Sequence, residues 1–209
     1  MRHGLLAAIV LSSAPSVGLA QVTPSLSSQR PAVPSANAAT TAVDPRAEPT
    51  VEEIVVPETP VRRAEATLVV PCAFPIVAAR MRDFTRYPDF LRRLRGARVI
   101  HRNRAETDVY FQVELPRALG VYWFLQHMTV VASTPERLEI TGLSTDGNVG
   151  HIETRVRAER VRGAVPATRL RFSLLGVPVF PALPSTVTAY LRDAVRGATL
   201  GLRDACAGR

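Results

Sequence analysis

The sequence predicts an α+β domain in which one antiparallel β-sheet packs against a single long helix near the C-terminus. A strand and two short helices come first, within residues 64–95. Segments of alternating apolar and polar residues follow as far as residue 174, and the short turns between them indicate antiparallel neighbours. Only the last element, from about residue 184, is long enough to cover the buried face of such a sheet.

The first 20 residues are predicted to be a signal peptide. Arg2 and His3 form a polar start, Leu5 to Leu11 is apolar, and small residues at Gly18 and Ala20 suit a signal peptidase. The apolar core is shorter than the ~20 residues of a membrane span. We therefore expect an exported protein, periplasmic or secreted. The alternative is a buried N-terminal helix.

Residues 21–62 are predicted to be a disordered, proline-rich linker. Seven prolines recur among Ser, Ala, Thr and Glu, and no aromatic residue is present. Such a segment cannot bury enough apolar surface to offset its loss of conformational entropy. We expect an extended spacer, with the folded domain at residues 63–209.

The excess positive charge lies in that domain. All 26 basic residues are Arg, against 18 acidic residues. Five of each precede residue 64, so the formal net charge of +8 belongs to the remainder of the chain. This charge favours anionic partners such as a membrane surface, whereas export argues against nucleic acid.

The first part of the domain predicts a strand at 64–70 and a helix at 74–82, with Pro75 tolerated in its first turn. Pro88 interrupts the helical pattern, and a second short helix is predicted at 89–95. The aromatic cluster from Tyr87 to Leu91 is interpreted as packing of the short helices against the long one. A gate at a cavity mouth is the alternative.

Six further strands are predicted. The clearest places Val109, Phe111, Val113 and Leu115 on one face, with polar residues between them. The segment 121–132 is apolar on both faces and predicts a central strand. Asp146-Gly147 is a hairpin signal. The remaining strands are predicted at 96–102, 137–143, 152–159 and 170–174.

The final helix carries an apolar stripe over five turns. The stripe consists of Val187, Leu191, Ala194, Ala198 and Leu202. Gly197 and Gly201 each weaken the helix by ~1 kcal/mol relative to Ala, and they allow another group to approach closely.

With these elements in place, the chain resembles a polyketide cyclase/coenzyme-Q-binding START-type domain of the SRPBCC (START-like) superfamily. The resemblance rests on Val69-Val70-Pro71, Val77, Asp83, Tyr87 to Leu91 and the closing helix 187–206. It implies a helix-grip fold, in which a curved antiparallel sheet surrounds the long C-terminal helix and encloses an apolar cavity. Relatives are implied to bind quinones, sterols, phospholipids, polyketides or plant hormones, and some are enzymes.

Cys72 and Cys206 are the only cysteines, and an even pair in an exported protein is a candidate disulfide. In a grip-type fold the end of the long helix lies near the short helices, which makes this pairing geometrically reasonable. Two separate buried thiols are the alternative.

Inward rows of the predicted sheet and the helix stripe supply the candidate ligand-binding residues. They are Phe111, Val113, Trp123, His127, Thr154, Phe172, Val187, Tyr190, Leu191 and Ala194. His127 faces the cavity if its strand shares the inward parity of Trp123, and it could then bond a ligand oxygen or move a proton. The alternative is a structural histidine in the core, bonded to a neighbouring strand or to water.

No catalytic residue beyond this weak candidate, no metal motif and no cofactor is indicated. The sequence therefore predicts an exported binding protein for a hydrophobic, lipid-like small molecule. A cyclase- or hydrolase-type enzyme using the same cavity and an interaction module without a cavity are the alternatives. Arginines at 155, 157, 169 and 171, and others near the short helices, indicate either a solvated surface or docking to an anionic membrane.

Overall fold

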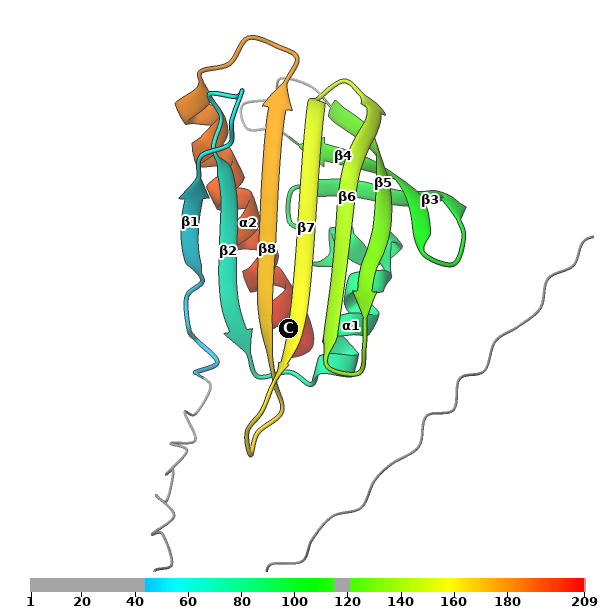
Figure 1. The fold of residues 1–209 in the computed structure, drawn as a ribbon, viewed down its shortest axis with the longest axis vertical. Coiled ribbons are helices and arrows are strands. Elements are labelled where there is room, and N and C mark those ends of the chain that lie inside the picture. Colours follow the sequence, from blue (N-terminus) through cyan, green and yellow to red (C-terminus); the bar gives the residue numbers. More distant parts are fainter. Residues whose placement is uncertain (1–43, 115–120, 209) are drawn as a thin grey trace, which may run out of the picture. The chain divides into compact units, whose positions relative to one another are not determined.

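A computed structural model describes residues 44–114 and 121–208. The elements are β1 (Thr50–Ile54), β2 (Arg63–Val70), α1 (Phe74–Arg82), the 3₁₀ helix η1 (Phe84–Asp89), β3 (Leu94–Arg102), β4 (Glu106–Glu114), β5 (Val121–Ser133), β6 (Arg137–Gly147), β7 (Gly150–Val161), β8 (Ala167–Pro178) and α2 (Pro184–Cys206). The strands form one antiparallel sheet in the order β1-β2-β8-β7-β6-β5-β4-β3 (Figure 1). The α+β prediction is therefore confirmed.

The described chain contains one strand more than predicted. β1 lies inside the segment assigned to a linker, so that prediction is wrong for residues 50–54, and the short helices follow the second strand. β1 pairs with β2 along its whole length, from Thr50 opposite Thr67 to Ile54 opposite Arg63. Most of its side chains are exposed. β1 is held mainly by backbone pairing and by ion pairs of Glu53 with Arg62 and Arg192, and only Val51 packs against the core. With so little apolar burial, its composition did not predict a strand.

The second short helix also differs from the prediction at 89–95. A 3₁₀ helix occupies Phe84–Asp89 and includes Pro88, and β3 begins at Leu94. Tertiary contacts hold this turn, because the Tyr87 hydroxyl donates to the carbonyl of Met81 at 2.7 Å. Phe84, Tyr87 and Phe90 are buried, and the Tyr87 ring contacts the rings of the other two. The packing interpretation of this aromatic cluster is confirmed.

The core consists of two apolar clusters. The first joins the sheet to α1, η1 and the C-terminal turns of α2. The second joins the N-terminal half of α2 to β2 and the end of β8. Phe172 and Leu174 of β8 are only half-buried and pack against both clusters. They mark the region where the two clusters meet.

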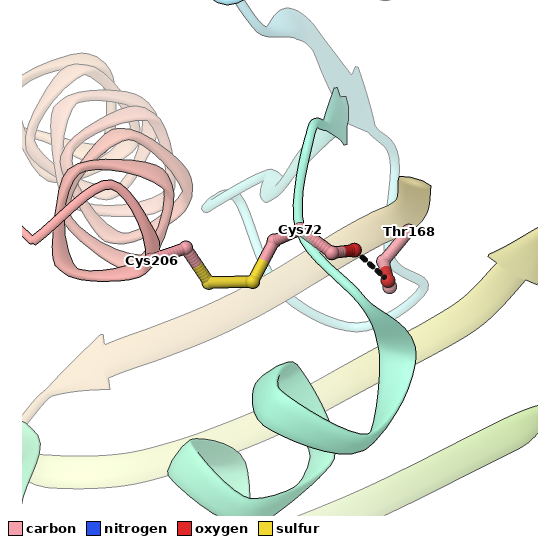
Figure 2. The surroundings of a disulfide bond; sticks show 3 residues. All are labelled: Cys72, Thr168 and Cys206. Carbon is pink, nitrogen blue, oxygen red and sulfur yellow. Dashed lines mark hydrogen bonds between the residues drawn. A yellow bond between two sulfur atoms is a disulfide. The ribbon is translucent and has the colours of Figure 1, made fainter. Parts of the chain in front are cut away.

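The C-terminal end of α2 is held by covalent and close backbone contacts. The predicted disulfide between Cys72 and Cys206 is present, with the Cα atoms 6.0 Å apart and 134 residues between them in sequence (Figure 2). The carbonyl of Cys72 also accepts a hydrogen bond from Thr168 Oγ1 at 2.8 Å. At Gly201 a Cβ would lie 1.9 Å from the carbonyl oxygen of Phe90, so η1 can approach α2 only because this residue is glycine.

The predicted signal peptide, Leu115 and the turn that follows it lie outside the described residues. Among the residues that are described, no helix combines the length and apolar character needed to cross a membrane.

Candidate ligand-binding face

The sheet register defines an inner face that is directed toward α2. In β2, Ala64, Ala66, Leu68 and Val70 are buried on this face. Their partners in β8 include Phe172 and Leu174, and these in turn lie opposite Val156 and Thr154 of β7. The same inward row continues through the sheet to Phe111 and Val113 of β4.

Four of the predicted strand residues lie in this inner row. Phe111 is buried and its ring contacts Tyr87 and Phe124. Val113, Thr154 and Phe172 are half-buried. An inward residue of a close-packed core is normally inaccessible to solvent. The partial exposure of these residues shows that the inner face is not fully covered.

The four predicted residues of α2 lie along the second core cluster or beside it. Leu191 is buried in that cluster, and Val187 and Tyr190 pack against it. Ala194, one turn further on, is half-buried. The Arg93 guanidinium lies 4.8 Å from the centre of the Tyr190 ring, and burial raises the pKa of the Tyr190 hydroxyl. The Arg93–Tyr190 contact joins the segment just before β3 to the second turn of α2.

The predicted parity of β5 is wrong. Phe124, Gln126 and Met128 are buried on the inner face, whereas Trp123 and His127 belong to the alternate row on the outer face. Both rows of this strand are apolar, so alternation alone could not select between them. The register decides the matter, because Phe124 lies opposite Phe111.

His127 therefore does not face the region between the sheet and α2. Its Nδ1 lies 2.7 Å from Asp108 Oδ1, on the neighbouring strand β4, and its Nε2 lies 3.9 Å from Glu106. This arrangement supports strand pairing on the outer face. Within residues 44–114 and 121–208, no three His, Cys, Asp or Glu side chains gather as metal ligands.

Two polar residues of the inner face have unsatisfied atoms, and only one of these residues was predicted. Gln126 is 2% exposed, and its Nε2 has no hydrogen-bond partner among residues 44–114 and 121–208. Thr154 Oγ1 is also buried and unpartnered. Leaving a buried polar group unpaired costs about 1–3 kcal/mol, so each such group calls for an explanation. The sequence did contain a signal for Gln126: it is a polar residue in the same alternating row as the apolar residues Phe124 and Met128.

Gly142 of β6 allows these two side chains to converge. A Cβ at this position would lie 2.6 Å from Thr154 Oγ1, 2.8 Å from Gln126 Cδ and 2.5 Å from Met128 Sδ. Any larger residue would therefore displace all three side chains. The absence of a side chain at Gly142 creates a small polar centre in an apolar face.

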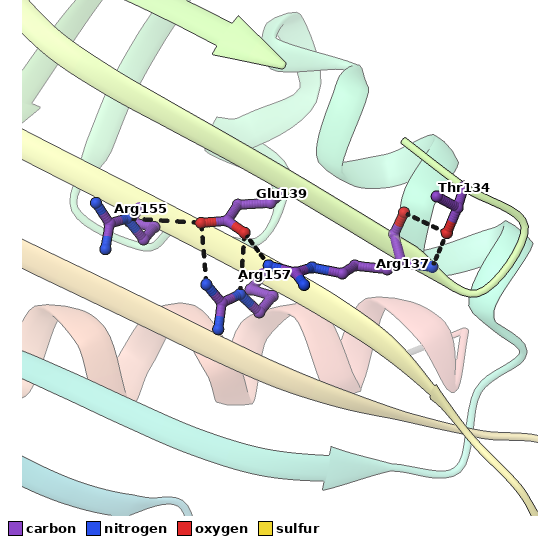
Figure 3. Close-up of polar contacts among 5 residues, drawn as sticks. All are labelled: Thr134, Arg137, Glu139, Arg155 and Arg157. Atoms are coloured by element: carbon purple, nitrogen blue, oxygen red, sulfur yellow. Dashed lines mark hydrogen bonds and ion pairs between the residues drawn. The ribbon is translucent and has the colours of Figure 1, made fainter. Parts of the chain in front are cut away.

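The outer face carries a buried carboxylate among arginines (Figure 3). Arg157 donates to both Glu139 oxygens, at 3.2 and 3.0 Å, and Arg137 donates to the same carboxylate. The Nε atom of Arg155 lies 3.7 Å from Glu139 Oε1. The hydrogen bond from Arg157, aided by Arg137, lowers the pKa of Glu139. Of the four arginines predicted to form a basic surface (155, 157, 169 and 171), three therefore lie beside a carboxylate, because Arg171 also pairs with Glu65.

Two surface hollows lie away from the inner face. One, of about 200 Å³, lies on the outer face between β2, β7 and β8 and is lined by Arg157, Arg169 and Arg171 together with Thr67 and Glu159. The other, of about 350 Å³, lies between the β7–β8 turn and the start of α1. Neither is lined by a residue of α2.

Comparison with solved structures identifies the architecture. A STAR-related lipid transfer protein from Xanthomonas axonopodis superposes with a TM-score of 0.65 at 11% identity, over 75% of this chain and 92% of that one. The lipid transfer and protein localization domain of human StarD13 gives 0.64 at 11% identity, over 77% and 85%. The Zhui aromatase/cyclase from Streptomyces sp. R1128 gives 0.53 at 15% identity, over 70% and 92%.

The chain has a START-type fold. The helix-grip prediction is therefore confirmed. No protein-family model matches the sequence, and no curated protein matches it either. At 11–15% identity these structures share the architecture with this domain, and its chemistry has to be argued from its own residues.

Proposed function

We propose that this domain binds a hydrophobic, lipid-like small molecule between the inner face of the sheet and α2, and carries or sequesters it. The carrying observation is the half-buried state of Phe172 and Leu174 at the junction of the two core clusters. A ligand there would replace the missing contacts of these side chains and bury its own apolar surface, at ~25 cal/mol per Å². Binding requires the side chains at this junction to move apart.

Two neighbours in the comparison are named as lipid transfer proteins, which supports a lipid-like ligand. The third neighbour is named as an aromatase/cyclase, which is the support for the alternative of an enzyme using the same face. Catalysis is not part of the proposal, because the one candidate residue, His127, lies on the outer face.

We further propose that the protein acts after export, in the periplasm or outside the cell. The first 20 residues support this by their pattern, and the disulfide supports it because such bonds persist in oxidising compartments. The domain would collect its ligand at an anionic bilayer, toward which the net charge of +8 attracts it.

Extraction of the intact protein from its native exported fraction, followed by native mass spectrometry, tests the binding proposal. We expect a bound lipid-like molecule, or uptake of one from vesicles.

The variant Leu174→Trp should fill the junction of the two apolar clusters and reduce uptake of the lipid at least five-fold. The matched variant Leu143→Trp changes an exposed leucine and should bind normally. Failure of the unaltered protein to retain or take up any apolar molecule would instead favour an interaction module without a cavity.

A further inference from the structure

Gln126 and Thr154 supply hydrogen-bonding capacity that the described part of the chain does not use. The side chains come from β5 and β7, and both lie beside Gly142 of the intervening strand β6. The Gln126 amide nitrogen can donate two hydrogen bonds, and the Thr154 hydroxyl can donate one and accept others. Gln126 Nε2 and Thr154 Oγ1 are buried, and neither has a hydrogen-bond partner within the described ranges 44–114 and 121–208.

We infer that these two side chains recognise one uncharged oxygen, carbonyl or hydroxyl, on the apolar ligand. This inference rests on the proposed function and specifies the class of ligand. The lone pairs of such an oxygen would accept from Gln126 Nε2 and from the Thr154 hydroxyl, which gives each buried group a partner. Apolar binding sites typically contain a few polar groups of this kind, which fix the orientation of the ligand.

The surroundings favour a neutral oxygen over a charged head group. The neighbours at the polar centre are apolar: Met128 lies beside it, Val109 of β4 lies opposite Gln126, and Leu174 of β8 lies opposite Thr154. Arginines at positions 155 and 157 alternate with Thr154 and Val156, so they point to the outer face, where Glu139 holds them. A carboxylate or phosphate at the polar centre would therefore lose its hydration without gaining a cation.

Met128 and Gly142 explain how an oxygen could be admitted. The Met128 sulfur lies nearest to the point above Gly142, and a methionine side chain changes its rotamer readily. Gly142 adds no atoms of its own to this space. A larger residue at position 142 would push the Gln126 and Thr154 side chains apart.

The test uses fluorene and 9-fluorenone, two tricyclic probes of similar size that differ by one carbonyl group. Both are dialysed together against the intact chain, and the bound amounts are measured. We expect the protein to enrich fluorenone over fluorene, and Thr154→Val and Gln126→Met each to reduce that enrichment about five-fold. Thr199→Val is the matched control, because the Thr199 hydroxyl already donates to the Val195 carbonyl. It should leave the enrichment unchanged.

A second measurement separates recognition from a structural role. Without a ligand, Thr154→Val removes a hydroxyl that has no partner, so its urea midpoint should equal or exceed that of the unaltered protein. A clear fall in the midpoint would show that the hydroxyl serves the fold, and would overturn the inference.

The outcomes distinguish this inference from the proposed function. Retention of neither probe would defeat the proposed function itself. Retention of both, with a ratio that the two variants do not change, would defeat only the recognition of an oxygen. Stronger binding of fluorene-9-carboxylate than of fluorenone would also defeat it, because the site would then select charge.

Discussion

At the scale of single residues, the two faces of the sheet differ in how their buried polar side chains are hydrogen-bonded. On the outer face, Glu139 is buried but fully bonded, by Arg157 and Arg137. On the inner face, Gln126 and Thr154 are buried and unpaired. Buried charge is tolerated only when it is compensated, whereas an unpaired neutral group carries a smaller cost that a ligand can remove.

Glu139→Gln should destabilise the domain by about 2 kcal/mol at neutral pH, because the arginines lose their shared carboxylate. The pKa of Glu139 is lower in the folded protein than its ordinary value of 4.5. Its contribution is therefore complete above that value and is lost as the pH falls through the folded pKa.

Urea unfolding at several pH values checks this expectation. The difference between the unaltered protein and Glu139→Gln should shrink as the pH falls below 4.5. A difference that is constant from pH 7 to pH 3 would mean that the carboxylate charge is not what stabilises this part of the sheet.

At the scale of elements, α2 has two glycines with different surroundings. Gly201 lies against the Phe90 carbonyl, whereas no atom of the described residues lies within 4 Å of a Cβ at Gly197. The sequence identified both positions as helix-weakening, and only the packing of η1 distinguishes them. Both glycines allow a close approach, and within the described residues only Gly201 has one.

Gly201→Ala should lower the free energy of unfolding by at least about 2 kcal/mol, because a backbone carbonyl cannot move aside as a side chain can. Gly197→Ala should raise it by about 1 kcal/mol through helix propensity alone. Thermal unfolding of both variants provides the comparison. Equal effects of the two substitutions would show that η1 does not pack on α2 as described.

Loss of the disulfide should cost about 2–5 kcal/mol, since the bond closes a long loop in the unfolded chain. Replacing both Cys72 and Cys206 by Ser should give this loss in urea unfolding under oxidising conditions. A reducing agent should destabilise the unaltered protein to a similar extent and leave the double variant unaffected. Insensitivity of the unaltered protein to reduction would contradict this role of the disulfide.

At the scale of the whole molecule, exposed apolar residues gather at the connection from β8 to α2. Val179 and Leu183 are 73% and 71% exposed. Between them, Phe180 contacts the ring of Tyr122 at the start of β5. A surface of this kind on a basic domain is suited to shallow insertion into an anionic bilayer.

Replacing Val179 and Leu183 together by Glu should weaken sedimentation with anionic phosphatidylglycerol vesicles at least five-fold. Val131→Glu, at another exposed valine, is the control and should have little effect. Binding of the unaltered protein should also fall with added salt. Equal binding to neutral and anionic vesicles would refute the role assigned to the net charge.

The sequence predicts most of the architecture, because the hydrophobic periodicity and the turn residues match the observed strands, helices and turns. α1 was placed at its observed bounds, and the disulfide was anticipated. The residues of the candidate site were harder to predict from the sequence. β5 is apolar on both faces, so its inward row depends on pairing with β4, and the polar centre depends on three strands meeting at Gly142. Such features arise from contacts distant in sequence.

The attachment of α2 at one end has a mechanical consequence. Its last turns are joined to the domain by the disulfide and by the contact of Gly201 with Phe90. Its first turns are held by non-covalent contacts alone. These are the smaller apolar cluster, a hydrogen bond from Arg62 N to Thr188 Oγ1, the contact of Arg93 with Tyr190, and the ion pair of Arg192 with Glu53. The helix has 23 residues and is about 34 Å long. A pivot of 10° about Cys206 would move its first residue by about 6 Å, enough to part the inner face beside Leu174 while the covalent end stays in place.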